Sequence, residues 1–405
     1  MQRKTFPAPR PDWENTIKSE GLVFSQDFDG DDHYWNEFAA YTFTRGETMW
    51  LQDRIEEAHA MCLEAIDHII NGPLLFRLGL PDHAIRLALD SWRRREPDFY
   101  GRFDFIYNSD DDSLKLLEYN ADTPTGMVEG AISQSTWFTD KNMHLQGFEE
   151  WNELGTGFAS RWRELRDYTE HHVLHLACVN DEINPTGEDK ANLEVVAHAA
   201  KMAGWETHII DIDQLFWDAK NRIWHDAAGR RVRNLFKLYP WEDMVSDEYG
   251  KVLANGGYEA MDNWFEPAWK MFLSNKILLV ALWELFPHHP LLVPAYLDSP
   301  REMRDWVKKP LFGREGDGIV INAPSFDVHV EHTDGYITET ATEEEYIYQA
   351  YVQAPNYLSD ENEPNHPLLG AWVVDAESVA FAMREADGYI TDYYSRFVPC
   401  MIERY

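Results

Sequence analysis

The chain has 405 residues, 44% of them hydrophobic, with 16 Trp, 19 Tyr and 21 Phe. This composition excludes a disordered chain and predicts a large core shared by two or three closely associated lobes. The formal net charge of −35, from 36 basic and 71 acidic side chains, argues against a nucleic-acid partner and an anionic membrane surface. The acidity indicates either a solvated surface or attraction of a cationic substrate or metal ions.

The three cysteines, Cys62, Cys178 and Cys400, have neither metal-ligand spacing nor the number that a disulfide framework needs. Cys62 and Cys178 lie in apolar runs, so we expect them to pack in a core and the protein to occupy a reducing compartment. The N-terminal residues lack the apolar stretch of a signal peptide, and no run of 18 apolar residues occurs. We therefore expect a cytoplasmic protein.

In chain order, residues 51–70 place apolar side chains on one helical face, and residues 100–120 predict a β-hairpin. Residues 172–179, 190–203 and 207–212 predict a strand, a helix and a strand, the unit that builds a parallel sheet. Residues 267–286 predict one strongly apolar helix, which contains Lys276. Short strands are expected at 305–309, 318–322, 346–353 and 370–383. This alternation predicts a mixed α/β fold.

The hairpin carries a candidate metal site. Because side chains alternate along a strand, Arg102 and Asp104 share one face, as do Glu118 and Asn120. A turn centred on Asp111 places Asp104 opposite Glu118 and Arg102 opposite Asn120. Opposed carboxylates need compensation, which Mg²⁺ provides, with Arg102 free to bind phosphate. An acidic hairpin whose two acids face water is the alternative.

Other candidates are less specific. Thr123 and Thr125 follow the hairpin and offer hydroxyls to a substrate, or cap a turn or helix. Lys309 precedes the glycine-containing stretch FGREGDG, which suits a loop over phosphates or an ordinary hairpin turn. Lys276 could extend to solvent from its helix, and Arg384 could form a surface ion pair.

Taken together, RFDF, LLEYNADTPTG, SNK, KPLFGREGDG, IYQAYV and MREADGYITDYYSRFVP resemble the synthetase domain of the glutathionylspermidine synthase family over roughly residues 15–400. The resemblance implies an ATP-grasp fold in one unit spanning 1–405. It further implies a preATP-grasp-like substrate lobe at about 170–265, a nucleotide-clamping lobe at about 290–360, and no N-terminal amidase domain.

The resemblance also assigns roles to residues. It implies that Asp104, Glu118 and Asn120 hold Mg²⁺. The implied ATP-binding residues are Arg102, which would also be catalytic, Lys276, Lys309, Gly316, Gln349 and Arg384. Thr123 and Thr125 stand where the family commonly has serines that contact substrate. Leu238 stands where the family has a substrate-contacting threonine, so the acyl substrate stays open among glutathione, another γ-glutamyl compound and a peptide carboxylate.

The implied activity is an ATP- and Mg²⁺-dependent ligase that joins a carboxylate to an amine through an acyl phosphate. The expected amine is a polyamine such as spermidine. The main alternative is a non-catalytic module that binds nucleotide or polyamine. An unrelated metal-dependent hydrolase is a third interpretation, against which the absence of a His-rich cluster argues.

Overall fold

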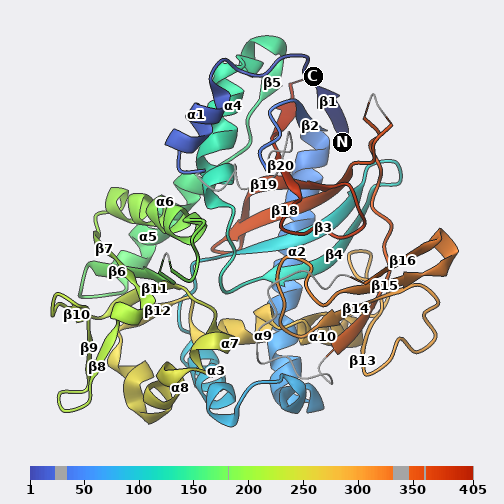
Figure 1. The fold of residues 1–405 in the computed structure, drawn as a ribbon. Coiled ribbons are helices and arrows are strands. Elements are labelled where there is room, and N and C mark those ends of the chain that lie inside the picture. The colour runs from blue at the N-terminus through green and yellow to red at the C-terminus, as the bar shows by residue number, and fades with distance from the viewer. Residues whose placement is uncertain (23–33, 181, 332–345, 360–361, 405) are drawn as a thin grey trace.

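The computed structural model describes residues 1–22, 34–180, 182–331, 346–359 and 362–404. Within these ranges the chain folds into five β-sheets with helices packed between and around them, the mixed α/β class that the element order predicts (Figure 1). Residues 332–345 and 360 of the expected clamping lobe lie outside the described residues.

The α-helices are α1 (Trp13–Ser19), α2 (Arg45–Asn71), α3 (Asp82–Arg94), α4 (Gln134–Asp140), α5 (Leu154–Asp167), α6 (Glu188–Met202), α7 (Trp241–Met244), α8 (Glu248–Val252), α9 (Met271–Ser274) and α10 (Ile277–Leu285).

Two five-stranded antiparallel sheets position the site. In spatial order, the first contains β20 (Arg396–Val398), β19 (Glu377–Ala386), β18 (His366–Val374), β3 (Tyr100–Asn108) and β4 (Ser113–Asn120). The second contains β13 (Ala295–Leu297), β17 (Tyr346–Ala350), β14 (Trp306–Pro310), β15 (Val320–Ala323) and β16 (Val328–Glu331).

The parallel unit expected from the sequence is present. Strand β6 (Val173–Cys178), helix α6 and strand β7 (Glu206–Asp211) follow one another, and the two strands pair in parallel. Two further parallel strands, β11 (Asn234–Leu238) and β12 (Asn263–Phe265), complete this sheet in the order β12-β11-β6-β7. Helix α6 buries its apolar residues because such crossovers cover a face of a parallel sheet.

Two smaller sheets complete the architecture. One contains β1 (Gln2–Thr5), β2 (Ala39–Thr44), β21 (Cys400–Glu403) and β5 (Phe148–Glu149), so that strands from both ends of the chain share it. The other is formed by β10 (Arg231–Val232), β9 (Ile223–His225) and β8 (Phe216–Asp218).

Helix α2 confirms the amphipathic pattern and extends it toward the N-terminus. Thr44 and Glu47 form a capping box that satisfies backbone N–H groups at its start. Ile55, Cys62 and Ile66 are fully buried on its inner face, where α2 crosses the sheet that contains β18 and β3 (Figure 1). All three cysteines are buried and free, which confirms the packing role expected of Cys62 and Cys178.

Two expected elements are interrupted. The single helix predicted over 267–286 is wrong: Asn275 has an extended backbone, so α9 and α10 are separate and Lys276 lies at the break. The Asn275 side chain stabilises the break by accepting from the Ile277 amide and donating to the Leu78 carbonyl. The strand predicted over 370–383 is a hairpin of β18 and β19, turned at Asp375 and Ala376, which both have positive φ.

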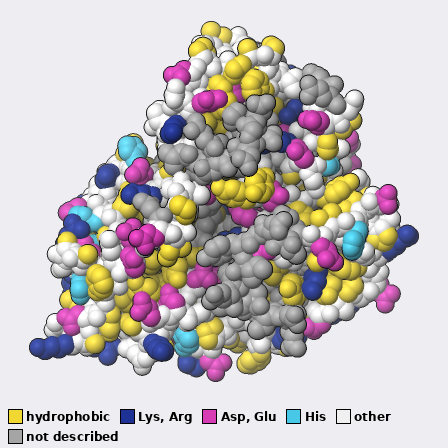
Figure 2. Space-filling view, in the orientation of Figure 1, with side chains coloured by type: hydrophobic (Ala, Val, Ile, Leu, Met, Phe, Trp, Pro, Cys, Tyr) yellow, Lys and Arg dark blue, Asp and Glu magenta, His cyan; other side chains and the backbone are white. Residues whose placement is uncertain are grey.

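Acidic side chains are distributed over several elements of the face shown in Figure 2, among basic and apolar ones. This distribution agrees with the interpretation of the net charge as a solvated surface. Among the described residues, no helix is both long and apolar enough to cross a membrane.

Candidate active site

One cavity brings together all the residues expected from the sequence to bind metal or ATP, and both threonines expected to contact substrate. Its walls come from both five-stranded sheets, from the loop after β4 and from the glycine-containing loop between β14 and β15. The predicted residues among those that line it are Arg102, Asp104, Glu118, Asn120, Thr123, Thr125, Lys276, Lys309, Gly316, Gln349 and Arg384. These residues lie up to 282 positions apart, Arg102 and Arg384 being the extremes, so the cavity is a product of the tertiary fold.

The predicted hairpin register is confirmed where it matters for the cavity. Arg102 pairs with Asn120 and Asp104 with Glu118. A β-bulge follows, because Phe105 pairs with Leu116 and leaves Leu117 unpaired. Strict alternation would direct the Leu117 side chain to the other face of β4 from Glu118. Because of the bulge, Leu117 also lines the cavity.

The two opposed carboxylates have different electrostatic surroundings. The side chains of Asp104 and Glu118 are 15% and 25% exposed, so neither projects fully into water as the alternative interpretation requires. Burial raises the pKa of Asp104 above its usual range; Arg102, 3.2 Å away, opposes this effect, and Glu118 adds to it. Burial also acts to raise the pKa of Glu118, but Lys276 and Lys309 lower it below its usual range.

The donor set fits Mg²⁺ bound together with a nucleotide. No group of three or more His, Cys, Asp or Glu side chains suited to a metal occurs within the described ranges. Two carboxylates and one amide beside a cavity instead match a cation that keeps water and takes other ligands from phosphates. Asn120 donates its Nδ2 to Asp104 at 3.1 Å, so the amide must turn to present its oxygen to a metal.

Lys276 is buried and does not extend to solvent. Its Nζ lies 2.7 Å from Glu118 Oε1 and donates to the Gly313 carbonyl at 3.1 Å. The break before α10 makes this possible, because it directs Lys276 toward the hairpin and the glycine-containing loop. Lys276 therefore links β4 to the segment that the sequence analysis places over phosphates.

Lys309 is the buried cation in this cavity that lacks an ion pair. Its Nζ donates to the Leu117 carbonyl at 3.0 Å and to Gln349 Oε1 at 2.7 Å. Among the described residues, no carboxylate lies within 4.0 Å of it. Burial lowers the pKa of Lys309 to about 8, although Glu118 opposes this effect. A buried ammonium group with neutral partners at a cavity wall is suited to receive an anion.

The glycine-containing loop lies against the cavity from one side. Gly316 and Gly318 have φ of +76° and +66°, a backbone region that glycine adopts without strain. Arg314 contacts Glu242 of α7 at 2.7 Å, and Glu315 lies 3.9 Å from Arg384. The loop therefore contacts α7 through Arg314 and approaches β19 through Glu315.

The two predicted arginines approach from the hairpin sheet. Arg102 donates to the Thr125 carbonyl at 2.6 Å, which ties β3 to the loop after β4. Arg384, on β19, donates to the carbonyls of Asp392 and Ser395. Its side chain is 17% exposed, so the exposed ion pair considered for it is wrong.

Several cavity residues were not singled out from the sequence. Arg314 and Glu315 lie inside the glycine-containing stretch FGREGDG, where a charged pair between the glycines is the signal for them. Glu188 begins α6 directly after Gly187, and burial together with Glu129 raises its pKa to about 8. Tyr34 reaches the cavity from a distant part of the chain, and no local pattern signals this position.

Leu238 does not belong to this cavity. It is 4% exposed at the end of β11 and packs in the hydrophobic core. The adjacent Lys237 forms a buried ion pair with Asp122 at 2.6 Å, which anchors the start of the loop that contains Thr123 and Thr125.

Comparison with known proteins identifies the family. The family model described as glutathionylspermidine synthase preATP-grasp matches residues 4–403. The chain belongs to this family. A Haemophilus influenzae protein with the provisional name acid–amine ligase is 32% identical over 410 residues, covering 98% of this chain and 99% of its own length. The chain is accordingly an acid–amine ligase of the glutathionylspermidine synthase type, and the predicted enzyme class, an ATP-dependent carbon–nitrogen ligase, is confirmed.

Longer relatives match over part of their length. Trypanothione synthetase of Crithidia fasciculata is 24% identical and the bifunctional glutathionylspermidine synthetase/amidase of Escherichia coli 28% identical. The matches cover 86% and 82% of this chain, which spans 54% of each relative. A glutathione synthetase-like effector of Globodera pallida superposes with a TM-score of 0.56 at 14% identity, over 96% of this chain and 95% of its own. This similarity supports the predicted ATP-grasp fold.

Proposed function

We propose that this ligase uses Mg-ATP to phosphorylate a carboxylate, which releases ADP and leaves an acyl phosphate. An amine then attacks the acyl phosphate, so that the amide forms and phosphate leaves. The observation that carries the proposal is Lys309: a buried lysine at the cavity wall, hydrogen-bonded to neutral groups and without a carboxylate within 4.0 Å among the described residues. A phosphate oxygen would supply the negative charge that the hydrogen-bond partners of this lysine lack.

Residues around Lys309 support a division of labour. Asp104, Glu118 and Asn120 would hold Mg²⁺, which neutralises charge on the transferring phosphoryl group. Arg102 and Arg384 would bind phosphate oxygens, and Lys276 would keep the glycine-containing loop close to them. Gln349 holds Lys309 in place, and the backbone around Gly316 would cover the phosphates.

The chemistry needs positioning more than a protein nucleophile. Cationic side chains that line the cavity would stabilise charge that develops on the phosphoryl group, and the glycine-containing loop beside it would limit access of water. Thr123 and Thr125 lie in the loop after β4 and line the cavity, so their hydroxyls can contact the carboxylate substrate. We propose a polyamine such as spermidine as the amine and a γ-glutamyl compound or peptide as the acid.

The test supplies the purified protein with Mg-ATP, a panel of polyamines and a panel of thiol peptides, and measures ADP release and the amide by mass spectrometry. We expect ADP and amide in equal amounts for at least one pair. The matched variant Asp104→Asn/Glu118→Gln should reduce both to background, because it removes the two negative charges that hold the metal without changing the size of the side chains. Nucleotide binding without ADP release for any pair would instead identify a non-catalytic module.

A further inference from the structure

A cluster of charged side chains, separate from those that line the cavity, lies on the other face of the hairpin. Lys270 is fully buried, and its Nζ lies 2.9 Å from Asp98 Oδ2 and 3.4 Å from Glu266 Oε2. We call these three residues the Lys270 cluster. None of them lines the cavity. Its two carboxylates face two cations, because Arg161 also lies 3.6 Å from Asp98 Oδ1, so the cluster is not a ligand site.

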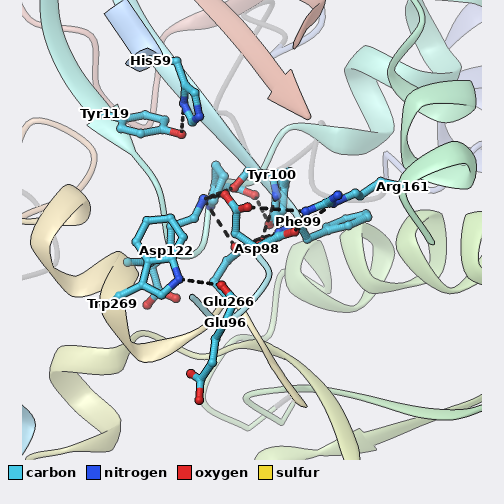
Figure 3. A network of polar contacts seen from close by, with 12 residues as sticks. His59, Glu96, Asp98, Phe99, Tyr100, Tyr119, Asp122, Arg161, Glu266 and Trp269 are labelled. Carbon is cyan, nitrogen blue, oxygen red and sulfur yellow. Dashed lines mark hydrogen bonds and ion pairs between the residues drawn. The ribbon is translucent and has the colours of Figure 1, made fainter. Parts of the chain in front are cut away.

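The Lys270 cluster holds the backbone at the start of β3. The Glu266 carboxylate accepts hydrogen bonds from the amides of Phe99 and Tyr100 at 3.0 to 3.2 Å. Lys270 Nζ donates to the Tyr100 carbonyl at 2.9 Å. In Figure 3, Asp98 and Glu266 converge on this backbone, with Arg161 approaching from the other side. Arg102, a cavity residue, follows Tyr100 by two positions.

The other strand of the hairpin is held on the same side. Lys270 Nζ lies 5.9 Å from the centre of the Tyr119 ring, which stacks on Phe103 with ring centres 3.8 Å apart. The Tyr119 hydroxyl meets His59 Nδ1 at 3.2 Å (Figure 3). Glu118 and Asn120, the neighbours of Tyr119, face the cavity.

The segment that carries Lys270 also carries Lys276. Only the short helix α9 and Asn275 separate the two lysines, and Lys276 pairs with Glu118 on β4. The segment from Glu266 to Lys276 is therefore attached to β3 at one end and to β4 at the other. Movement of one attachment relative to the other would change the distance between Lys276 and the hairpin carboxylates.

We propose that Lys270 is a positioning residue, which sets the placement of Lys276 relative to Asp104 and Glu118 by tying its own segment to the backbone of β3. The relevance to catalysis rests on the proposed function, whereas the mechanical link itself does not. Such outer supports commonly matter because a small displacement of a ligand weakens the binding of a metal or nucleotide.

The test uses Asp98→Asn/Glu266→Gln/Lys270→Met, which removes the cluster's charges together and so leaves no unpaired buried ion. We expect cooperative unfolding and an affinity for Mg-ATP about tenfold weaker than in the wild type, by titration calorimetry. In a Lys276→Met background the same three changes should alter the affinity less than about twofold, because the effect passes through Lys276. Equal losses in both backgrounds, or none in either, would overturn the proposal.

Asp226→Asn is the control. Asp226 is also a buried carboxylate in an ion pair, with Arg230 at 2.6 Å, but its contacts lie around β9, β10 and His175. This variant should bind Mg-ATP like the wild type. A tenfold loss in the control as well would show that general destabilisation explains the result and would overturn the proposal.

Hydrogen exchange gives a readout that does not depend on nucleotide. In the triple variant, peptides covering 99–104 and 275–280 should exchange faster together, and those of the control should not. If the wild type fails to bind Mg-ATP, the proposed function fails, and the exchange result alone decides the link. Unchanged exchange at 275–280 would overturn it.

Discussion

Lys270 and Lys309 are both buried and both contact the same hairpin, yet their surroundings differ. Lys270, on the side of Tyr119, has two carboxylates within 3.4 Å, which raise its pKa although burial opposes this effect. Lys309, on the cavity side, has two neutral hydrogen-bond acceptors, and burial lowers its pKa. A lysine whose charge is compensated within the chain supports the structure, whereas one without such compensation is suited to a ligand.

The largest effect that tests this contrast is on stability. Lys270→Met leaves Glu266 without its cation and Asp98 with only Arg161, 3.6 Å away, so we expect a loss of about 3–5 kcal/mol in the free energy of unfolding. The measurement is denaturant unfolding at neutral pH. A loss below about 1 kcal/mol would contradict the structural role, because it is the size expected of an exposed ion pair.

The His59 side chain gives the next largest effect, as a pH dependence. Burial lowers its pKa to about 4, from a usual value near 6.5. Between these values the unfolded chain binds more protons than the folded one, so stability falls as the pH is lowered from 6.5 toward 4. In His59→Gln this acid-induced loss should be smaller by about 3 kcal/mol.

Thermal or denaturant unfolding at several pH values between 4 and 7 measures the His59 effect. The variant keeps a hydrogen-bonding group opposite the Tyr119 hydroxyl, so its stability at pH 7 serves as the internal reference. Parallel pH profiles for variant and wild type would show that His59 titrates normally in the folded protein.

Lys309→Met should have the opposite signature to Lys270→Met. We expect little change or a gain in stability, because the variant removes a buried charge that has no ion pair. Affinity for Mg-ATP should fall by about tenfold to a hundredfold, which corresponds to the free energy of one hydrogen bond between charged groups. Calorimetric titration and unfolding of the same preparation measure both quantities. A large loss of stability with unchanged affinity would reverse the contrast between the two lysines.

The sequence by itself determined much of the local structure. Alternation along 100–120 predicts the hairpin and its register at Asp104 and Glu118, because side-chain direction in a strand follows directly from position. The same kind of pattern predicts α2 and the unit of β6, α6 and β7. The ordered motifs indicate the family and contain all the predicted site residues, which line the cavity.

Tertiary structure decided what those patterns could not. The break at Asn275 depends on a hydrogen bond to Leu78, 197 positions away, so hydrophobicity alone predicts an unbroken helix. The bulge at Leu117 appears only once β4 is paired. Lys270 and Lys309 have different roles because a distant segment supplies a carboxylate to Lys270 and a neutral amide to Lys309. The pKa of a buried lysine depends on such partners and not on its neighbours in the sequence.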